Sequence, residues 1–79
     1  MHWLTIHVVD DGENPLNGES VKIVIHHGGL FPDTSLEEYT QGYGVTHFYF
    51  EGGSSADVYV GGVCQLEAVD VDDAYAVSI

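Results

Sequence analysis

Short runs of alternating apolar and polar residues, separated by clusters of turn-forming residues, constrain the fold of this chain most strongly. Residues 3–9 place Leu4, Ile6 and Val8 on one face, which is the period-two pattern of a half-buried strand. The Asp, Gly, Asn and Pro residues of 10–18 then reverse the chain. No stretch has the period of an amphipathic helix, so the pattern predicts an all-β fold.

The same alternation recurs along the rest of the chain. Residues 20–27 carry Val21, Ile23 and Ile25 on one face, and we expect this strand to lie antiparallel to the first. Further strands are predicted over residues 36–40, 45–50, 56–60, 63–71 and 75–79, the last pairing into a sheet. Residues 36–40 also suit one helical turn capped by Thr34 or Ser35, but a strand is favoured. Turn signals every eight to twelve residues are typical of a sandwich or barrel.

A chain of 79 residues has room for one domain, residues 1–79, and buries only about 60% of its unfolded surface on folding. Hydrophobic residues make up 44% of it, which is enough for a folded core. We predict a small two-sheet antiparallel sandwich of about seven strands. Its predicted core residues are Leu4, Ile6, Val8, Val21, Ile23, Ile25, Phe48, Phe50, Val58 and Val60.

The charge balance excludes two classes of partner. Lys22 is the only basic side chain besides five histidines, and thirteen carboxylates bring the net charge to −12. Nucleic acids and anionic membranes both require Lys and Arg for binding, so neither is an expected partner. A basic protein, a divalent cation and a neutral glycan stay open as partners. We expect the acidity mainly to serve solubility, since self-repulsion keeps a small β protein monomeric or only weakly oligomeric.

Cys64 is the only cysteine, so the chain cannot form an internal disulfide or a CxxC motif. A nucleophilic role for Cys64 with His47 has no flanking motif to support it, and we expect Cys64 to be buried as a small hydrophobe. No cationic segment precedes the apolar residues of 1–9, and no apolar run is long enough to cross a bilayer. The chain is therefore expected to be soluble, with a secreted or cell-surface context if it belongs to a larger protein.

Two segments resemble a known family. From Val8 the run V-V-D-D-G-E-N-P-L-N-G-E-S-V-K-I is similar to the opening hairpin of carboxypeptidase regulatory-like, collagen-adhesin B-type and related transthyretin-like domains. The matching positions are Asp10, Pro15, Leu16, Gly18, Val21 and Ile23. Residues 40–48, with Thr, a short turn, Gly and an apolar strand containing Phe, resemble a second feature of that family. The resemblance implies a transthyretin-like or immunoglobulin-like sandwich.

The chain also departs from that family in ways that bear on function. Val8 stands two positions before Asp10, where collagen-adhesin B-type domains often carry the lysine of an isopeptide bond. Transthyretin-like enzymes that hydrolyse hydroxyisourate use an arginine and end in Tyr-Arg-Gly-Ser, whereas this chain has no arginine and ends in Ala-Val-Ser-Ile. The resemblance therefore implies neither the crosslink nor that activity.

The histidines and the acidic turns are candidate metal ligands. If the first two strands pair, His7 and His26 share one outward face near His2 and His27, where imidazoles on adjacent strands suit zinc or nickel. The acidic turns offer the hard oxygen ligands of calcium, without the helix-loop-helix pattern. The candidate metal ligands are His7, His26, Asp10, Asp11, Asp70, Asp72 and Asp73. The alternative is that the histidines lie on a solvated sheet face and the aspartates only form turns.

Aromatic residues offer a second candidate site. The candidates for stacking against a sugar are Trp3, Tyr39, Tyr43, Tyr49 and Tyr59, although tyrosine is also an ordinary β-former. The first hypothesis for function is a non-catalytic interaction or structural spacer module whose edge strands pair with a partner protein. The alternative is a small domain that binds a divalent metal ion or a glycan. No residue pattern predicts an enzyme.

Overall fold

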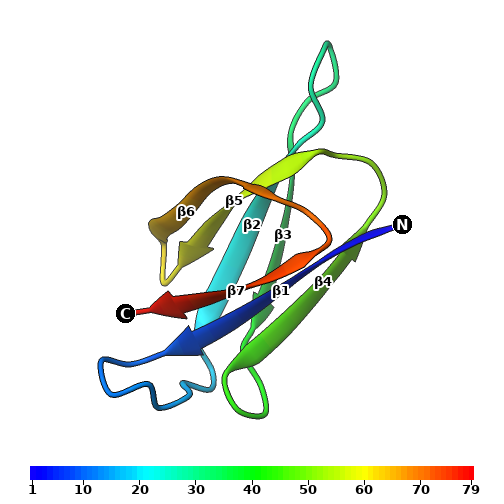
Figure 1. Ribbon diagram of the computed structural model, residues 1–79. Helices are drawn as coiled ribbons and strands as arrows, with labels where there is room; N and C mark the ends of the chain where they lie inside the picture. The colour runs from blue at the N-terminus through cyan, green and yellow to red at the C-terminus, as the bar shows by residue number, and fades with distance from the viewer.

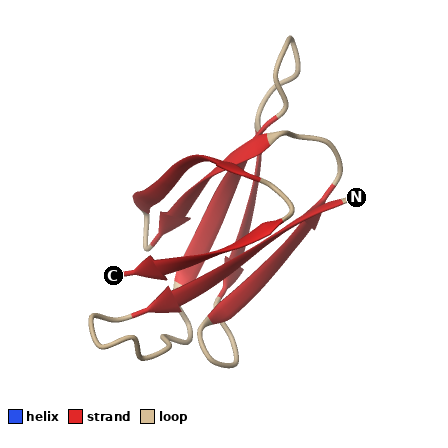
Figure 2. Cartoon of the chain, viewed as in Figure 1, coloured by secondary structure: helices blue, strands red, loops and turns tan.

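Two β-sheets stack face to face in the computed structural model, which describes residues 1–79 (Figure 1). The strands are β1 (His2–Val9), β2 (Ser20–His26), β3 (Thr34–Tyr39), β4 (Val45–Phe50), β5 (Ser55–Val60), β6 (Val63–Asp70) and β7 (Asp73–Ser78). One sheet has the order β4-β1-β7 and the other the order β3-β2-β5-β6. The predicted all-β sandwich of seven strands is confirmed, and Figure 2 shows strands joined only by loops. No helix that could span a membrane is present.

The core fills the space between the two inner sheet faces. All ten predicted core residues are buried, because the period-two alternation of each strand directs every second side chain inward. Ala56 and Val77 complete the cluster of twelve buried hydrophobic residues. The predicted strand after Ser35 is also confirmed, and it pairs antiparallel with β2 as an edge strand.

The predicted pairing of the first two strands is wrong. β1 pairs antiparallel with β4 and parallel with β7, whereas β2 lies in the other sheet between β3 and β5. Residues 10–19 therefore cross from one sheet to the other instead of closing a hairpin. The crossing is anchored where the amide of Leu16 donates to the carbonyl of Val8, at 3.0 Å, and Leu16 packs against the core. A connection of this length is not held to the tight geometry of a two-residue hairpin turn.

Residues 40–44 form the corner that carries the chain from β3 to β4. The hydroxyl of buried Thr40 donates to the carbonyl of Leu16 at 2.6 Å and accepts from the amide of Glu19 at 3.0 Å. Gly44 has a φ of 72°, and a Cβ there would lie 2.5 Å from the carbonyl oxygen of Val8. The corner is thus built on a buried hydroxyl and on a glycine that no other residue replaces without strain.

The C-terminal strand pairs into a sheet as predicted, but in parallel. β7 lies beside β1, and the amide of Ile79 continues the pairing by donating to the carbonyl of Val9 at 2.9 Å. At the far edge of the other sheet, β6 is irregular, and Ala68 adopts a φ of 49°. The Ala68 amide donates to Asp57 at 2.8 Å instead of continuing the ladder.

Cys64 is exposed, so its predicted burial is wrong. The register pairs Cys64 with Tyr59, which lies between the buried residues Val58 and Val60. Because successive side chains of a strand alternate, both Tyr59 and Cys64 face outward. The cysteine therefore lies on the solvent face of the four-stranded sheet.

Candidate functional site

The structure does not bring the predicted histidine ligands together. His7 lies between the buried residues Ile6 and Val8 of β1, and His26 follows the buried Ile25 of β2. Since β1 and β2 belong to opposite sheets, the two imidazoles lie on opposite outer faces of the sandwich. No group of three or more His, Cys, Asp or Glu residues is arranged to hold a metal ion.

The two acidic turns lie at opposite ends of β1. Asp10 follows its last residue and accepts from the amides of Gly12 at 2.8 Å and Asn14 at 2.9 Å. The bond from the Asn14 amide is the main cause that lowers the pKa of Asp10. Asp10 therefore closes its own turn, and the neighbouring Asp11 is exposed.

The second acidic turn also uses its carboxylates internally. Asp72 lies 2.8 Å from Nδ1 of His2 and accepts from the amide of Trp3 at 3.1 Å, and the bond to His2 is the main cause that lowers its pKa. Asp73 accepts from the amide of Ala74, and the backbone carbonyl of Asp70 accepts from the hydroxyl of Tyr75. Asp70, Asp72 and Asp73 therefore belong to the turn between β6 and β7, at the opposite end of β1 from Asp10 and Asp11.

The structure joins a cluster that the sequence did not reveal. Nδ1 of His26 lies 3.0 Å from Asp33, and Nε2 lies 3.0 Å from Asp57. The hydrogen bond with Asp57 is the main cause that raises the pKa of His26. The three residues become neighbours only through the pairing of β2 with β5 and the bend before β3. Because both ring nitrogens already have partners, His26 crosslinks these elements.

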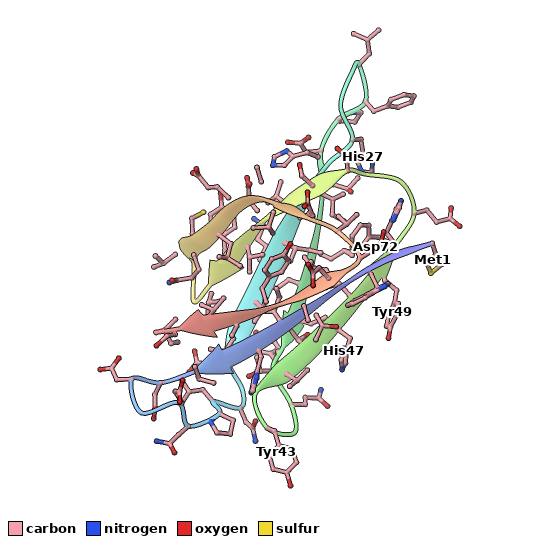
Figure 3. The ribbon with its side chains drawn as sticks, viewed as in Figure 1. Met1, His27, Tyr43, His47, Tyr49 and Asp72 are labelled. Carbon is pink, nitrogen blue, oxygen red and sulfur yellow. The ribbon has the colours of Figure 1, made fainter.

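The clearest unfilled position in the molecule lies beside β4. The backbone of Val45 points away from β1, because its amide and carbonyl exchange hydrogen bonds with Gln41 at 3.0 and 2.9 Å. Backbone direction alternates along an antiparallel strand, so the amides and carbonyls of His47 and Tyr49 also point to the open side. Gln41 occupies the start of a fourth strand position in this sheet, and the places beside His47 and Tyr49 have no strand (Figure 3).

The inner face of β3 is left uncovered below this position. Its inward residues Thr34, Leu36 and Glu38 are the register partners of Ile25, Ile23 and Val21, which are fully buried or nearly so. All residues of β3 are nevertheless exposed, and Leu36 shows 38% of its surface. A groove of about 440 Å³ opens here, lined by Glu38, Tyr39, Gln41, Gly42, Val45, Thr46 and His47. A four-stranded sheet thus extends beyond a three-stranded one along β4.

The outer face of the three-stranded sheet carries no carboxylate and no lysine. Its outward residues are Trp3, Thr5, His7, Val9, Val45, His47, Tyr49, Ala74, Ala76 and Ser78. Trp3 and Tyr49 are direct cross-strand neighbours, 40% and 66% exposed. Of the other predicted stacking residues, Tyr39 and Tyr43 lie near the groove, whereas Tyr59 faces outward from the opposite sheet.

Sequence reasoning missed two apolar features. Leu36 was assigned only to a strand, and its exposure follows from the unequal strand numbers of the two sheets. Leu30 and Phe31, 103% and 76% exposed, lie on the loop that projects from the sandwich between β2 and β3 (Figure 1). Two adjacent large hydrophobic residues within a Gly- and Pro-containing loop are the signal for the second feature.

The residues along β4 are suited to binding through the backbone. Cys64 and His47 lie in different sheets, so the structure does not bring them together as a nucleophile and its base. The open amides and carbonyls of β4 offer hydrogen bonds. Beside them, Leu36 offers apolar surface and the carboxylate of Glu38 offers one charge.

No protein-family model, no curated protein and no solved structure matches this chain.

Proposed function

We propose that this chain is a non-catalytic interaction module that binds an extended segment of a partner protein as a fourth strand beside β4. The observation that carries this proposal is the missing strand position, with open backbone groups at His47 and Tyr49 above the uncovered face of β3. In strand addition, main-chain hydrogen bonds supply affinity and side-chain pockets supply specificity. The irregular β6 is less suited to this role, because bulges interrupt ladder pairing.

Amide hydrogen exchange of the chain, measured with and without a bound peptide, tests the proposal directly. Random eight-residue peptides displayed on phage are selected against the folded chain, and the selected peptides are added to labelled protein. The amides of His47 and Tyr49 are expected to exchange rapidly in the free chain and slowly in the complex. Those of Thr46 and Phe48 already face β1 and change little. Selected peptides that leave His47 and Tyr49 unprotected would show that the proposal is wrong.

Two substitutions at one position separate the backbone from the side chain. Tyr49→Pro removes an amide that faces the open side, so it leaves the pairing with β1 intact while blocking strand addition. Tyr49→Ser retains that amide and removes the exposed ring. We expect Tyr49→Pro to abolish peptide binding and Tyr49→Ser to weaken it only modestly. Equal binding by both variants would contradict recognition through the backbone.

Binding of a neutral glycan is the second candidate function, and the uncharged outer face favours it. Trp3 and Tyr49 lie side by side there, and Gln41 and His47 line the adjacent groove. Aromatic faces beside amide and imidazole groups suit a ligand that has apolar faces and hydroxyls but no charge. A glycan array probed with the fluorescently labelled chain tests this function. No response from the wild type, or an identical response from Trp3→Ala, would exclude this surface.

We infer that the chain is related to the transthyretin-like sandwich domains, on the strength of the segments around Pro15 and Gly44. Two of the matched residues have structural roles that support the inference. Leu16 anchors the crossing between the sheets, and Gly44 accommodates the close approach of Val8. Such domains serve many functions, so the relationship informs the fold.

A further inference from the structure

We propose that the segment bound beside β4 carries a basic residue facing Glu38 and, two positions along, an apolar residue facing Leu36. This inference rests on the proposed strand addition and specifies the chemistry of the partner. The side chains of an added strand alternate between the outside of the sandwich and its inside. Every second residue of that strand therefore points toward the uncovered face of β3. Glu38 and Leu36 are the two side chains of that face that offer a charge and an apolar surface.

The order of the two residues follows from the directions of β3 and β4. The two strands run in opposite directions from the corner at residues 40–44 (Figure 1). Glu38 lies near that corner and lines the groove with Thr46 and His47. Leu36 is two residues farther from the corner on the same face of β3. The position of the bound strand nearest the corner therefore meets Glu38, and the next inward position meets Leu36.

Glu38 has no basic partner within the chain. The side-chain ion pairs of the molecule join histidines to Asp33, Asp57 and Asp72, and none includes Glu38. Lys22, the only lysine, is excluded by its position, because it points outward from β2 while its neighbours Val21 and Ile23 are buried. A strand laid over the groove would remove water from Glu38, and an unpaired carboxylate is costly to desolvate. A Lys or Arg of the partner removes that cost.

The same carboxylate rejects acidic segments. An aspartate or glutamate at the position facing Glu38 would bring two like charges into one partly desolvated groove, within a chain of net charge −12. Discrimination between partners then includes a repulsive contribution as well as an attractive one. Leu36 adds apolar surface that an alternating β-type segment covers.

A lysine scan along a peptide tests the inference. Five capped peptides of threonine and valine, each with a single lysine at one of five successive positions, are titrated by fluorescence anisotropy. We expect affinity to vary with a period of two residues, with one inward position binding about 5-fold tighter than its outward neighbours. At that position, glutamine in place of lysine is expected to bind about 5-fold more weakly, and glutamate more weakly still.

Neighbouring glutamates provide the matched variants. Glu38→Lys is expected to reverse the preference, so that the glutamate peptide binds tighter than the lysine peptide. Glu37→Gln, on the opposite face of β3, removes one negative charge and preserves the order. Leu36→Ser should weaken binding of the lysine, glutamine and glutamate peptides by similar factors. Leu30→Ser, which lies away from the groove, should not weaken their binding.

The outcomes distinguish this inference from the proposed function. If all peptides bind equally and still protect the amides of His47 and Tyr49, strand addition stands and the basic-apolar pattern is wrong. If Glu37→Gln and Glu38→Gln alter the preference equally, the selectivity comes from overall charge, and the assignment to Glu38 is wrong. If no peptide protects those two amides, strand addition itself fails, and this inference fails with it.

Discussion

The imidazole of His26 connects β2 to β5 and to the bend before β3, because carboxylates lie beside both of its nitrogens. Asp57 takes part twice, since it also accepts from the amide of Ala68, which is the main cause that lowers its pKa. His26 thus links β2 to β5, and its partner Asp57 links β5 to the irregular strand β6 at the edge of the sheet. Thr40 has the corresponding role at the corner between β3 and β4, where one buried hydroxyl binds the connection between β1 and β2 at both Leu16 and Glu19.

Stability is expected to fall as pH rises above 6.5, and His26 is the cause. Its pKa is raised above the ordinary value of 6.5 in the folded chain, so its stabilising effect is complete below pH 6.5 and is lost as pH rises through the raised pKa. The pKa of Asp57 is lowered from 3.8, so its contribution is present above that pH and is lost in acid. Melting temperatures between pH 5 and 8 should fall in the wild type and fall less in His26→Gln. His27→Gln serves as the control, and an unchanged slope in His26→Gln would contradict the assignment.

Thr40→Val should destabilise the chain by about 1–3 kcal/mol, because it leaves the Leu16 carbonyl and the Glu19 amide without their partner. Thr46→Val is the matched control. Thr46 is also buried, but its hydroxyl takes no part in the hydrogen bonds of the corner. Urea unfolding measures both variants. If Thr46→Val lost as much unfolding free energy as Thr40→Val, burial of the valine would be responsible, and not the loss of the hydrogen bonds of the corner.

Most strands and the core are predictable from the sequence, but the partners of the strands are not. Alternation decides which side chains of a strand face inward, as with Ile6 and Ile23, yet it does not decide in which sheet the strand lies. The expected common face of His7 and His26 is wrong for this reason, since it required β1 and β2 in one sheet. The open position beside β4 was equally hidden, because it depends on the number of strands in each sheet. The sequence predicts only that some edge strand is accessible to a partner.

The corner between β3 and β4 depends on Gly44, and two glycine substitutions test this. Gly44→Ala would place a methyl group 2.5 Å from the Val8 carbonyl oxygen and 2.8 Å from the Leu16 amide, so a loss of at least about 3 kcal/mol is expected. Gly18→Ala also acquires an unfavourable φ, of 77°, but has open space around it, so a loss of about 1–2 kcal/mol is expected. Chemical unfolding compares the two. Equal losses would show that φ alone, without the close approach, determines the cost.

At the scale of the whole molecule, the charge is distributed unevenly. Thirteen carboxylates and one lysine give a net charge of −12, yet the ten outward side chains of the β4-β1-β7 sheet include none of these residues. Apart from Asp73 at the start of β7, the carboxylates and the lysine lie on the other sheet, the turns and the loops.

The same charge makes stability depend on salt. Screening shortens the range of repulsion from about 30 Å at 0.01 M to about 10 Å at 0.1 M ionic strength, so salt should stabilise the folded chain. A gain of about 1 kcal/mol would raise the melting temperature of a domain of this size by about 4–8 °C. Thermal unfolding in 0.01 M and 0.5 M NaCl measures the effect, and KCl should act equally. A melting temperature that stays constant or falls would contradict self-repulsion as a significant cost.

The parallel pairing of β1 with β7 has a consequence for biosynthesis. β1 leaves the ribosome before β7, the strand that satisfies one of its edges, and five other strands are made between them. Contacts between such distant segments form slowly, since the loop between them must be closed first. Until then, β1 offers an open edge of its own, and β7 from a second nascent chain would make the same hydrogen bonds. Reciprocal exchange of β7 between two copies is therefore the expected misfolded form of this protein.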